Sequence, residues 1–237
     1  SRVAVGDSPA FGTAEGVLES LGVAHALRGQ GVRIADFGRT RPVTLPSGLT
    51  VGLATEALDC DLLVNLPRVK AHAQMRVTLA VKNYFGCVGG MRKPLWHMRH
   101  GGKKGRFADL LAELLTVLPG GITLVDGITA MHRTGPTGGE PFPLGLSACS
   151  TNPVALDRAL LEVLGVAPEA SPLLQACQRN GLAGAASNPL QFPLLTPADL
   201  RAAGFVVSPE LMPVRFNPLR FGKNSVRRLL IRLGALS

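Results

Sequence analysis

The chain has 237 residues, of which 46% are hydrophobic and only 17% are charged. This composition supports a folded core and excludes an intrinsically disordered chain, and no apolar run reaches the roughly 18 residues of a membrane-spanning helix. The net charge is +9, concentrated in two stretches rather than spread along the chain. The length fits one large α/β domain, or one domain with an appendage.

The four cysteines are far apart in the sequence, at Cys60, Cys87, Cys149 and Cys177. None belongs to a C-x-x-C pair, which argues against a zinc knuckle or an iron–sulfur run. At this chain length we expect reduced, buried thiols rather than a disulfide framework. The chain begins at Ser1 without a Met, which is typical of a processed or truncated start, so the lack of a signal peptide says little about location. A cytoplasmic location is the default expectation.

The first third of the chain alternates apolar runs with helical patterns. A buried strand is predicted over residues 2–7, ending in the turn Gly6-Asp7-Ser8-Pro9. Thr13 then caps a predicted helix over 13–28. Further elements are predicted in this order: a strand at 32–37, a possible strand at 49–51, a helical turn at 54–58, and a strand at 61–66 that is apolar on both faces and closed by Pro67.

The rest of the chain continues the same alternation. The predicted elements are helix 77–85, loop 91–105, helix 107–118, strand 122–126, strand 146–150, helix 153–164, helix 171–180 and a basic amphipathic helix at 225–236. Apolar strands between helices predict an α/β fold, with a mostly parallel sheet flanked by helices. We expect an α/β domain over 1–207 and a Pro-punctuated, basic C-terminal helical tail over 208–237.

The stretch from Arg68 to Arg106 carries ten Lys or Arg and three His, and no Asp or Glu. Apolar residues are interleaved with these charges, which is typical of a folded segment and not of a solvated tail. Positive charge gathered in a folded segment indicates a site for a negatively charged ligand.

Three predicted loops follow the carboxyl ends of strands, where functional loops of open α/β sheets lie. They begin at Gly6-Asp7, at Asn65 and at Asp126-Gly127. If they converge, two carboxylates face a cationic cluster, an arrangement suited to acid–base chemistry on an anion. The candidate catalytic groups are Asp7, His72, His97 and Asp126, and the candidate substrate-binding groups are Arg68, Lys70, Lys82, Asn83 and Lys93. The alternatives are a solvated loop for the basic groups and strand-end turns for the two carboxylates.

A metal site is not predicted. His97 and His100 are three residues apart, but no carboxylate accompanies them in the sequence. The glycine-rich pieces at 86–90 and 135–139 do not match phosphate-loop or dinucleotide-binding spacings. No cofactor is specified by the sequence.

At the stretch LPRVKAHAQMRVTLAVKNYFGCVGGMRK the chain resembles the prokaryotic family called domain of unknown function 362. The hallmark residues are Asn65, Leu66, Pro67, Arg68, Lys70, His72, Val77, Thr78, Lys82, Asn83, Phe85, Gly86, Lys93 and His97. The turn at Asp7, the Asp126-Gly127 strand end, the Gly135-Pro136 loop and the helix acid Asp157 match as well, and the resemblance covers roughly residues 2 to 185. It implies a redox-linked or small-molecule enzyme, without the ferredoxin-like cysteine region that many relatives carry.

The leading hypothesis is a small-molecule enzyme whose Lys/His-rich pocket takes an anionic carboxylate or phosphate substrate. The alternative is a cofactor- or metal-carrying redox partner protein. Nucleic-acid binding is disfavoured, because an aromatic content of 5% leaves few stacking platforms. The basic C-terminal helix is read as a solvated helix in preference to a membrane or partner contact.

Overall fold

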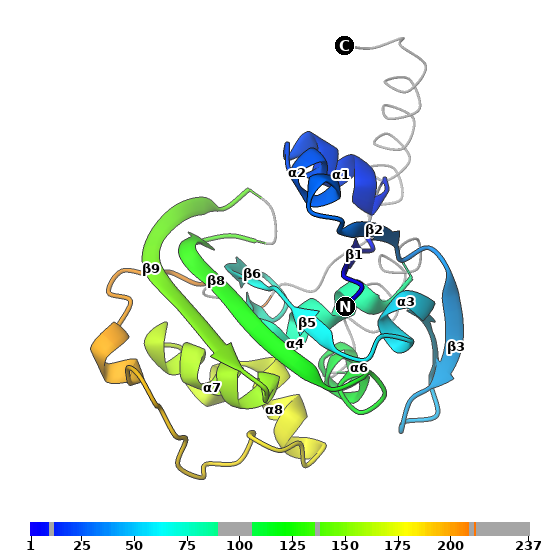
Figure 1. Ribbon diagram of the computed structural model, residues 1–237. Helices are drawn as coiled ribbons and strands as arrows, with labels where there is room; N and C mark the ends of the chain where they lie inside the picture. The colour runs from blue at the N-terminus through cyan, green and yellow to red at the C-terminus, as the bar shows by residue number, and fades with distance from the viewer. Residues whose placement is uncertain (10–11, 90–105, 136–137, 209–210, 212–237) are drawn as a thin grey trace, which may run out of the picture.

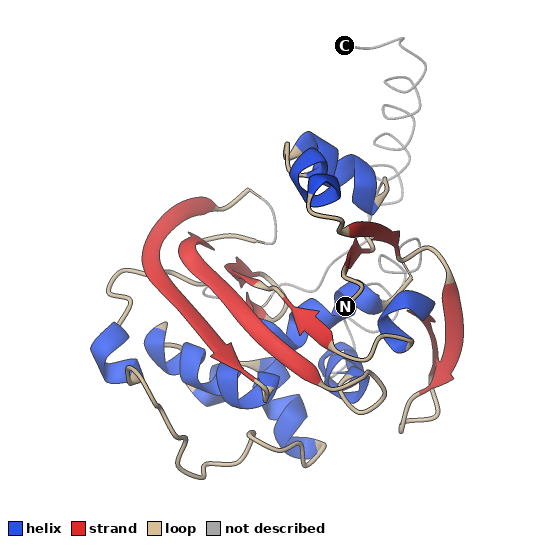
Figure 2. Ribbon diagram, in the orientation of Figure 1, coloured by secondary structure: helices blue, strands red, loops and turns tan. Residues whose placement is uncertain are grey.

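The computed structural model describes residues 1–9, 12–89, 106–135, 138–208 and Leu211 (Figure 1). They form a single domain of sheets flanked by helices, which confirms the predicted α/β class (Figure 2). The described strands form three parallel and three antiparallel pairs, so the pairing is mixed rather than mostly parallel. The helix expected at 225–236 lies outside the described residues, and the boundary at 207 remains a prediction.

The N-terminal part contains two small sheets and three short helices. Its elements are β1 (Ala4–Asp7), α1 (Ala14–Ser20), α2 (Ala24–Gly29), β2 (Arg33–Asp36), β3 (Thr40–Thr44), β4 (Thr50–Ala54) and α3 (Thr55–Leu58). Strand β1 pairs parallel with β2, and β3 pairs antiparallel with β4. The sequence prediction missed β3.

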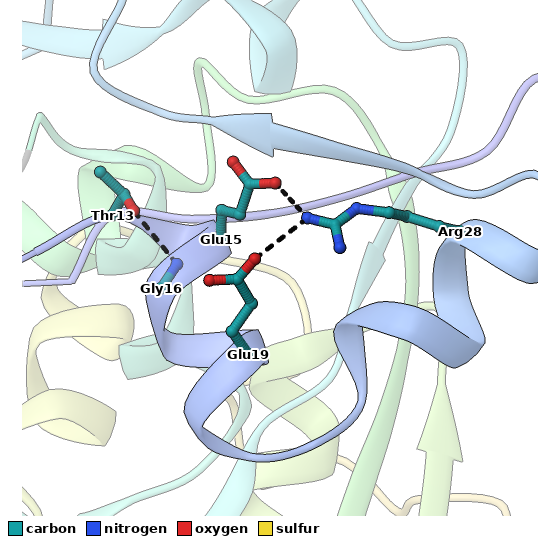
Figure 3. A network of polar contacts seen from close by, with 5 residues as sticks. All are labelled: Thr13, Glu15, Gly16, Glu19 and Arg28. Atoms are coloured by element: carbon teal, nitrogen blue, oxygen red, sulfur yellow. Dashed lines mark hydrogen bonds and ion pairs between the residues drawn. The ribbon is translucent and has the colours of Figure 1, made fainter.

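The single helix expected after Thr13 is two helices. Thr13 caps α1 as predicted, but Gly22 adopts a left-handed conformation with φ of 72° and turns the chain before α2. Arg28 of α2 donates hydrogen bonds back to Glu15 and Glu19 of α1, so the two helices are also joined by ion pairs (Figure 3).

The largest sheet has five strands, and β8 lies at its centre. The strands are β5 (Leu63–Asn65), β6 (Arg68–His72), β7 (Arg76–Thr78), β8 (Gly121–His132) and β9 (Glu140–Ser150). Both β5 and β6 pair parallel with one edge of β8, and β9 pairs antiparallel with the other edge. Strand β7 is a hairpin partner of β6.

Several predictions in this sheet are wrong. The loop expected after Asn65 contains strand β6, and the strand expected at 146–150 begins at Glu140. Strand β8 does not end at Asp126 but continues to His132, with a register shift next to Gly127. The helix expected at 77–85 begins as strand β7, because these residues pair with β6, and helix starts only at Ala80.

The helices of the second half cover one face of the sheet, the face turned away from the viewer in Figure 1. They are α4 (Ala80–Asn83), the 3-10 turn η1 (Tyr84–Cys87), α6 (Arg106–Leu114), α7 (Pro153–Val163) and α8 (Pro172–Arg179), with shorter 3-10 turns η3 (Pro168–Ala170) and η4 (Pro197–Leu200). The side chains of β8 therefore alternate between the helix-covered face and the opposite face of the sheet. Thr123 and Val125 are fully buried against the helices, whereas Leu124 and Asp126 are exposed on the other face.

Gly135 permits a close backbone contact between the loop after β8 and strand β6. Its carbonyl accepts a hydrogen bond from the Ala73 amide at 3.1 Å, and a Cβ at this position would lie 1.8 Å from the carbonyl oxygen of Ala71. A side chain here therefore requires the loop or the strand to move.

We expect Gly135→Ala to lower the free energy of unfolding by about 1–3 kcal/mol, because overpacking displaces backbone next to β6. Urea denaturation measures this. The matched control is Gly29→Ala, where a Cβ meets nothing within 4 Å and φ is not left-handed, so no loss is expected. Equal stability of both variants would contradict the close contact.

Candidate functional site

The candidate site is built on β6, where alternation sends Arg68, Lys70 and His72 to one side of the strand. Their burial increases along the strand: Arg68 is exposed, Lys70 is half-buried and His72 is buried. The three predicted groups are therefore in different environments, and only the first two are open to a ligand from solvent.

Arg68 lies beside Asp126 of the neighbouring strand β8. The Arg68 Nε atom is 3.6 Å from the Asp126 Oδ2 atom and donates a hydrogen bond to the Thr129 carbonyl at 3.0 Å. The other Asp126 oxygen accepts from the Ile128 amide at 3.1 Å. Both side chains are about half exposed, and a loose surface pair of this kind contributes roughly 0–1 kcal/mol. Arg68 can therefore exchange its partner for an incoming anion at little cost.

Lys70 is a half-buried cation whose surroundings act on its charge. Burial lowers the pKa of its ammonium group below the ordinary lysine value, the Asp7 carboxylate opposes this shift, and Arg68 adds to it. A cation that is partly desolvated and next to a second cation gains from the approach of a negative charge.

Asp7 reaches the cluster from the N-terminal sheet, as predicted for a carboxylate at the end of a strand. Its carboxylate accepts a hydrogen bond from the Ser8 amide at 2.7 Å, and Ser8 Oγ donates to the Val88 carbonyl at 2.8 Å. A Cβ built on Gly86 would lie 3.4 Å from Asp7 Oδ1. The glycine of the K-N-x-F-G motif thus leaves room for this carboxylate.

Thr78 is a site residue whose role sequence reasoning missed. It stands opposite Lys70 in the β6–β7 hairpin and is only 3% exposed. Within the described part of the chain its Oγ1 atom has no hydrogen-bond partner. Such a buried hydroxyl without a partner is uncommon in folded proteins. The motif contains Thr78, but the prediction placed it on a helix and not beside Lys70.

His72 is placed differently from what a general base requires. Its Nδ1 atom accepts hydrogen bonds from the backbone amides of Gln74 and Met75, at 3.0 and 3.3 Å. These bonds fix the turn between β6 and β7 and occupy the Nδ1 atom. Its catalytic role stays a prediction, as do the roles of His97 and Lys93, which lie outside the described residues.

Lys82 and Asn83 follow on α4, and Asn83 is part of a buried amide network. Its Nδ2 atom donates to Asn65 Oδ1 at 2.7 Å, while Asn65 donates to the Ala80 carbonyl at 3.0 Å and to Thr123 Oγ1 at 3.3 Å. Asn83 therefore holds α4 on the sheet. Lys82 Nζ lies 6.0 Å from the centre of the Phe85 ring.

Asp157 of α7 holds the other end of the same helix. Its carboxylate accepts a hydrogen bond from the Ala80 amide at 2.7 Å and contacts the Val81 amide at 3.3 Å. The Asp157 side chain is buried, with only 6% of the residue exposed. Burial raises the pKa of Asp157 to about 7, although the two amides favour the charged form.

A hollow of about 310 Å³ lies at the other end of β8, and none of the predicted site residues lines it. Its walls include Leu118, Gly121, Asn152 and Leu182. Among the residues that the structure describes, no three His, Cys, Asp or Glu side chains come together as metal ligands. All four cysteines are free; Cys87 and Cys177 are buried as expected, Cys60 is partly buried and Cys149 is exposed.

The raised pKa of Asp157 predicts a pH-dependent stability. In the window from about 4 to about 7 the folded state binds this proton more tightly than the unfolded state, so stability falls as pH rises through about 7. A shift of this size corresponds to as much as about 4 kcal/mol. Asp157→Asn cannot ionise but keeps an oxygen for the Ala80 amide. We expect it to flatten the decline in the free energy of unfolding between pH 5 and pH 8; an unchanged slope in urea titrations would exclude Asp157 as the cause.

Comparison with known proteins agrees with the sequence motifs. The family model described as Domain of unknown function (DUF362) matches residues 1–162. The chain is 36% identical over 229 residues to Thylakoid-associated protein sll1697 of Synechocystis sp., and the match covers 96% of this chain and 71% of that relative. No solved structure matches. With the family model covering more than half of the residues, and with these motifs built around β6 and α4, the chain belongs to the DUF362 family.

Proposed function

We propose that this protein is an enzyme that binds a small anionic substrate, a carboxylate or a phosphate, at Lys70. The observation that carries the proposal is the pairing of a half-buried lysine with the buried, unpartnered hydroxyl of Thr78 on the adjacent strand. An anion between them would neutralise the ammonium group and accept the hydroxyl proton as a hydrogen bond. Both groups would be satisfied by one ligand.

The neighbouring charges support an anion rather than a cation as the ligand. Arg68 lies on the same side of β6 and is held only by a loose pair with Asp126. It would supply a second, planar set of donors to a carboxylate or phosphate. Lys82, Asn83 and Lys93 remain proposed substrate-binding residues on the basic segment that follows.

Asp7 is the proposed base or orienting group of the reaction. It is a carboxylate close enough to Lys70 to raise the pKa of the lysine, and it is exposed to solvent. A proton could move between Asp7, the substrate and His97 or the Nε2 side of His72. In this scheme Asp126 orients Arg68.

The runner-up proposal is a cofactor- or metal-carrying redox partner protein. Stoichiometric metal or a visible absorption band in the purified protein would favour it.

The location of the protein is a separate proposal. None of the described helices is long and apolar enough to cross a membrane, and the Synechocystis relative is named as thylakoid-associated. A cytoplasmic protein with surface contact to a membrane through its net charge of +9 fits both.

We expect Lys70→Met to weaken binding of inorganic phosphate and of acetate, used as the two probes, by at least about tenfold, because a charged hydrogen bond is lost. Isothermal titration calorimetry measures the affinity. Thr78→Val, which removes the hydroxyl and keeps the shape, should weaken the same probe several-fold. The control Arg41→Met removes an exposed cation that pairs with Asp59 outside the site, and should leave binding unchanged. Equal affinities of wild type and Lys70→Met would contradict the proposal.

A further inference from the structure

One face of the five-stranded sheet exposes large aliphatic side chains. We call it the open face and define it by Leu62, Val64, Leu66, Leu124 and Ile128, which are between 47% and 64% exposed. Helices cover the opposite face, and in Figure 1 no described helix lies in front of β8 and β9. A sheet normally buries such side chains against another layer.

The strand register arranges these residues in rows across the sheet. Val64 of β5 pairs with Ile122 of β8. The next residues that face the same way are Leu66, just after β5, and Leu124 in β8. Leu124 in turn pairs with Cys149 of β9, which is exposed on the same face. Two neighbouring rows are thus apolar from β5 to β8, and the second continues to Cys149.

The following row is polar but balanced in charge. It contains Arg68, Asp126 and Ser147, in register with one another. The cation and the carboxylate neutralise each other across β6 and β8. The open face therefore has no net charge at this border, although the whole chain carries +9.

We propose that the open face is the interface of a homodimer, in which the sheets of two copies pack face to face. A two-fold axis near Leu124 would place the apolar rows of one copy on those of the other. The polar row of Arg68, Asp126 and Ser147 borders this contact and, with one cation and one carboxylate, adds no net charge to it. Neighbouring exposed apolar side chains on one face of a sheet typically mark an interaction site.

The charge pattern favours a second copy over a membrane or an acidic protein. A membrane-binding surface combines apolar residues with surrounding basic residues that meet anionic lipids. The border of the open face instead carries one Arg and one Asp, with Asp61 next to Leu62. An acidic partner would likewise leave Asp126 opposed by like charge. A copy of the same face presents both signs of charge.

Sedimentation velocity over a range of protein concentrations tests the interface. We expect wild type to reach twice the chain mass of 24.8 kDa at high concentration, and Leu124→Asp to remain at 24.8 kDa under the same conditions. The control Leu194→Asp changes a leucine that is 92% exposed and lies outside the open face, and should dimerise like wild type. A wild-type monomer at all concentrations, or a Leu124→Asp dimer, overturns the proposal.

Labelling of Cys149 gives a second readout that does not depend on a substitution. Among the four cysteines it is the exposed one, so a thiol reagent followed by mass spectrometry reports on it selectively. Alkylation should be at least about fivefold slower at concentrations where the dimer forms than at dilution. Flotation of the protein with anionic phospholipid vesicles, with Cys149 protected only when vesicles are present, would assign the open face to a membrane and overturn the homodimer.

Discussion

The backbone hydrogen bond from the Asp126 amide to the Pro67 carbonyl, at 2.9 Å, joins the two halves of one split strand to β8. Proline has no amide hydrogen, so the chain pairs with β8 as β5, loses the ladder at Pro67 and pairs again as β6. This keeps Arg68 level with Asp126 and carries Lys70 further along the sheet, where it stands opposite Thr78. The proposed anion site exists only because the split strand stays on one edge of β8.

A second set of polar contacts fixes helix α4 against the sheet next to that site. Asp157 caps the start of α4, and the amides of Asn65 and Asn83 tie the helix to the sheet. These groups bond to one another and to backbone, and fully bonded buried networks fix a single arrangement. The family motif therefore has two physical parts: amides and an acid that position α4, and cations on β6 that remain available to a ligand.

Sequence patterns predicted the elements with strong periodicity and failed where pairing decided the structure. Helices α6, α7 and α8 follow from apolar spacing and, for the last two, from a proline after the cap. Strand β3 contains Pro42, β9 contains Pro141 and Pro143, and each is an edge strand whose sequence resembles a loop. In the site, the rule about carboxyl ends of strands predicted that Asp7 lies near the basic residues, and the Asp7 carboxylate does act on the Lys70 ammonium group. The rule failed for Asp126, which lies inside β8. It could not predict Thr78, because the β6–β7 hairpin is visible only through pairing, nor that His72 would turn its Nδ1 to the backbone.

The proposed function depends on Lys70 being a partly desolvated ammonium group that binds an anion. The most direct measurement is its titration by ¹³C NMR after reductive methylation of the lysines, with and without inorganic phosphate. The account predicts a pKa for Lys70 below the ordinary lysine value that rises when phosphate is added, because the bound anion favours the charged form. An ordinary pKa that does not respond to phosphate would contradict it.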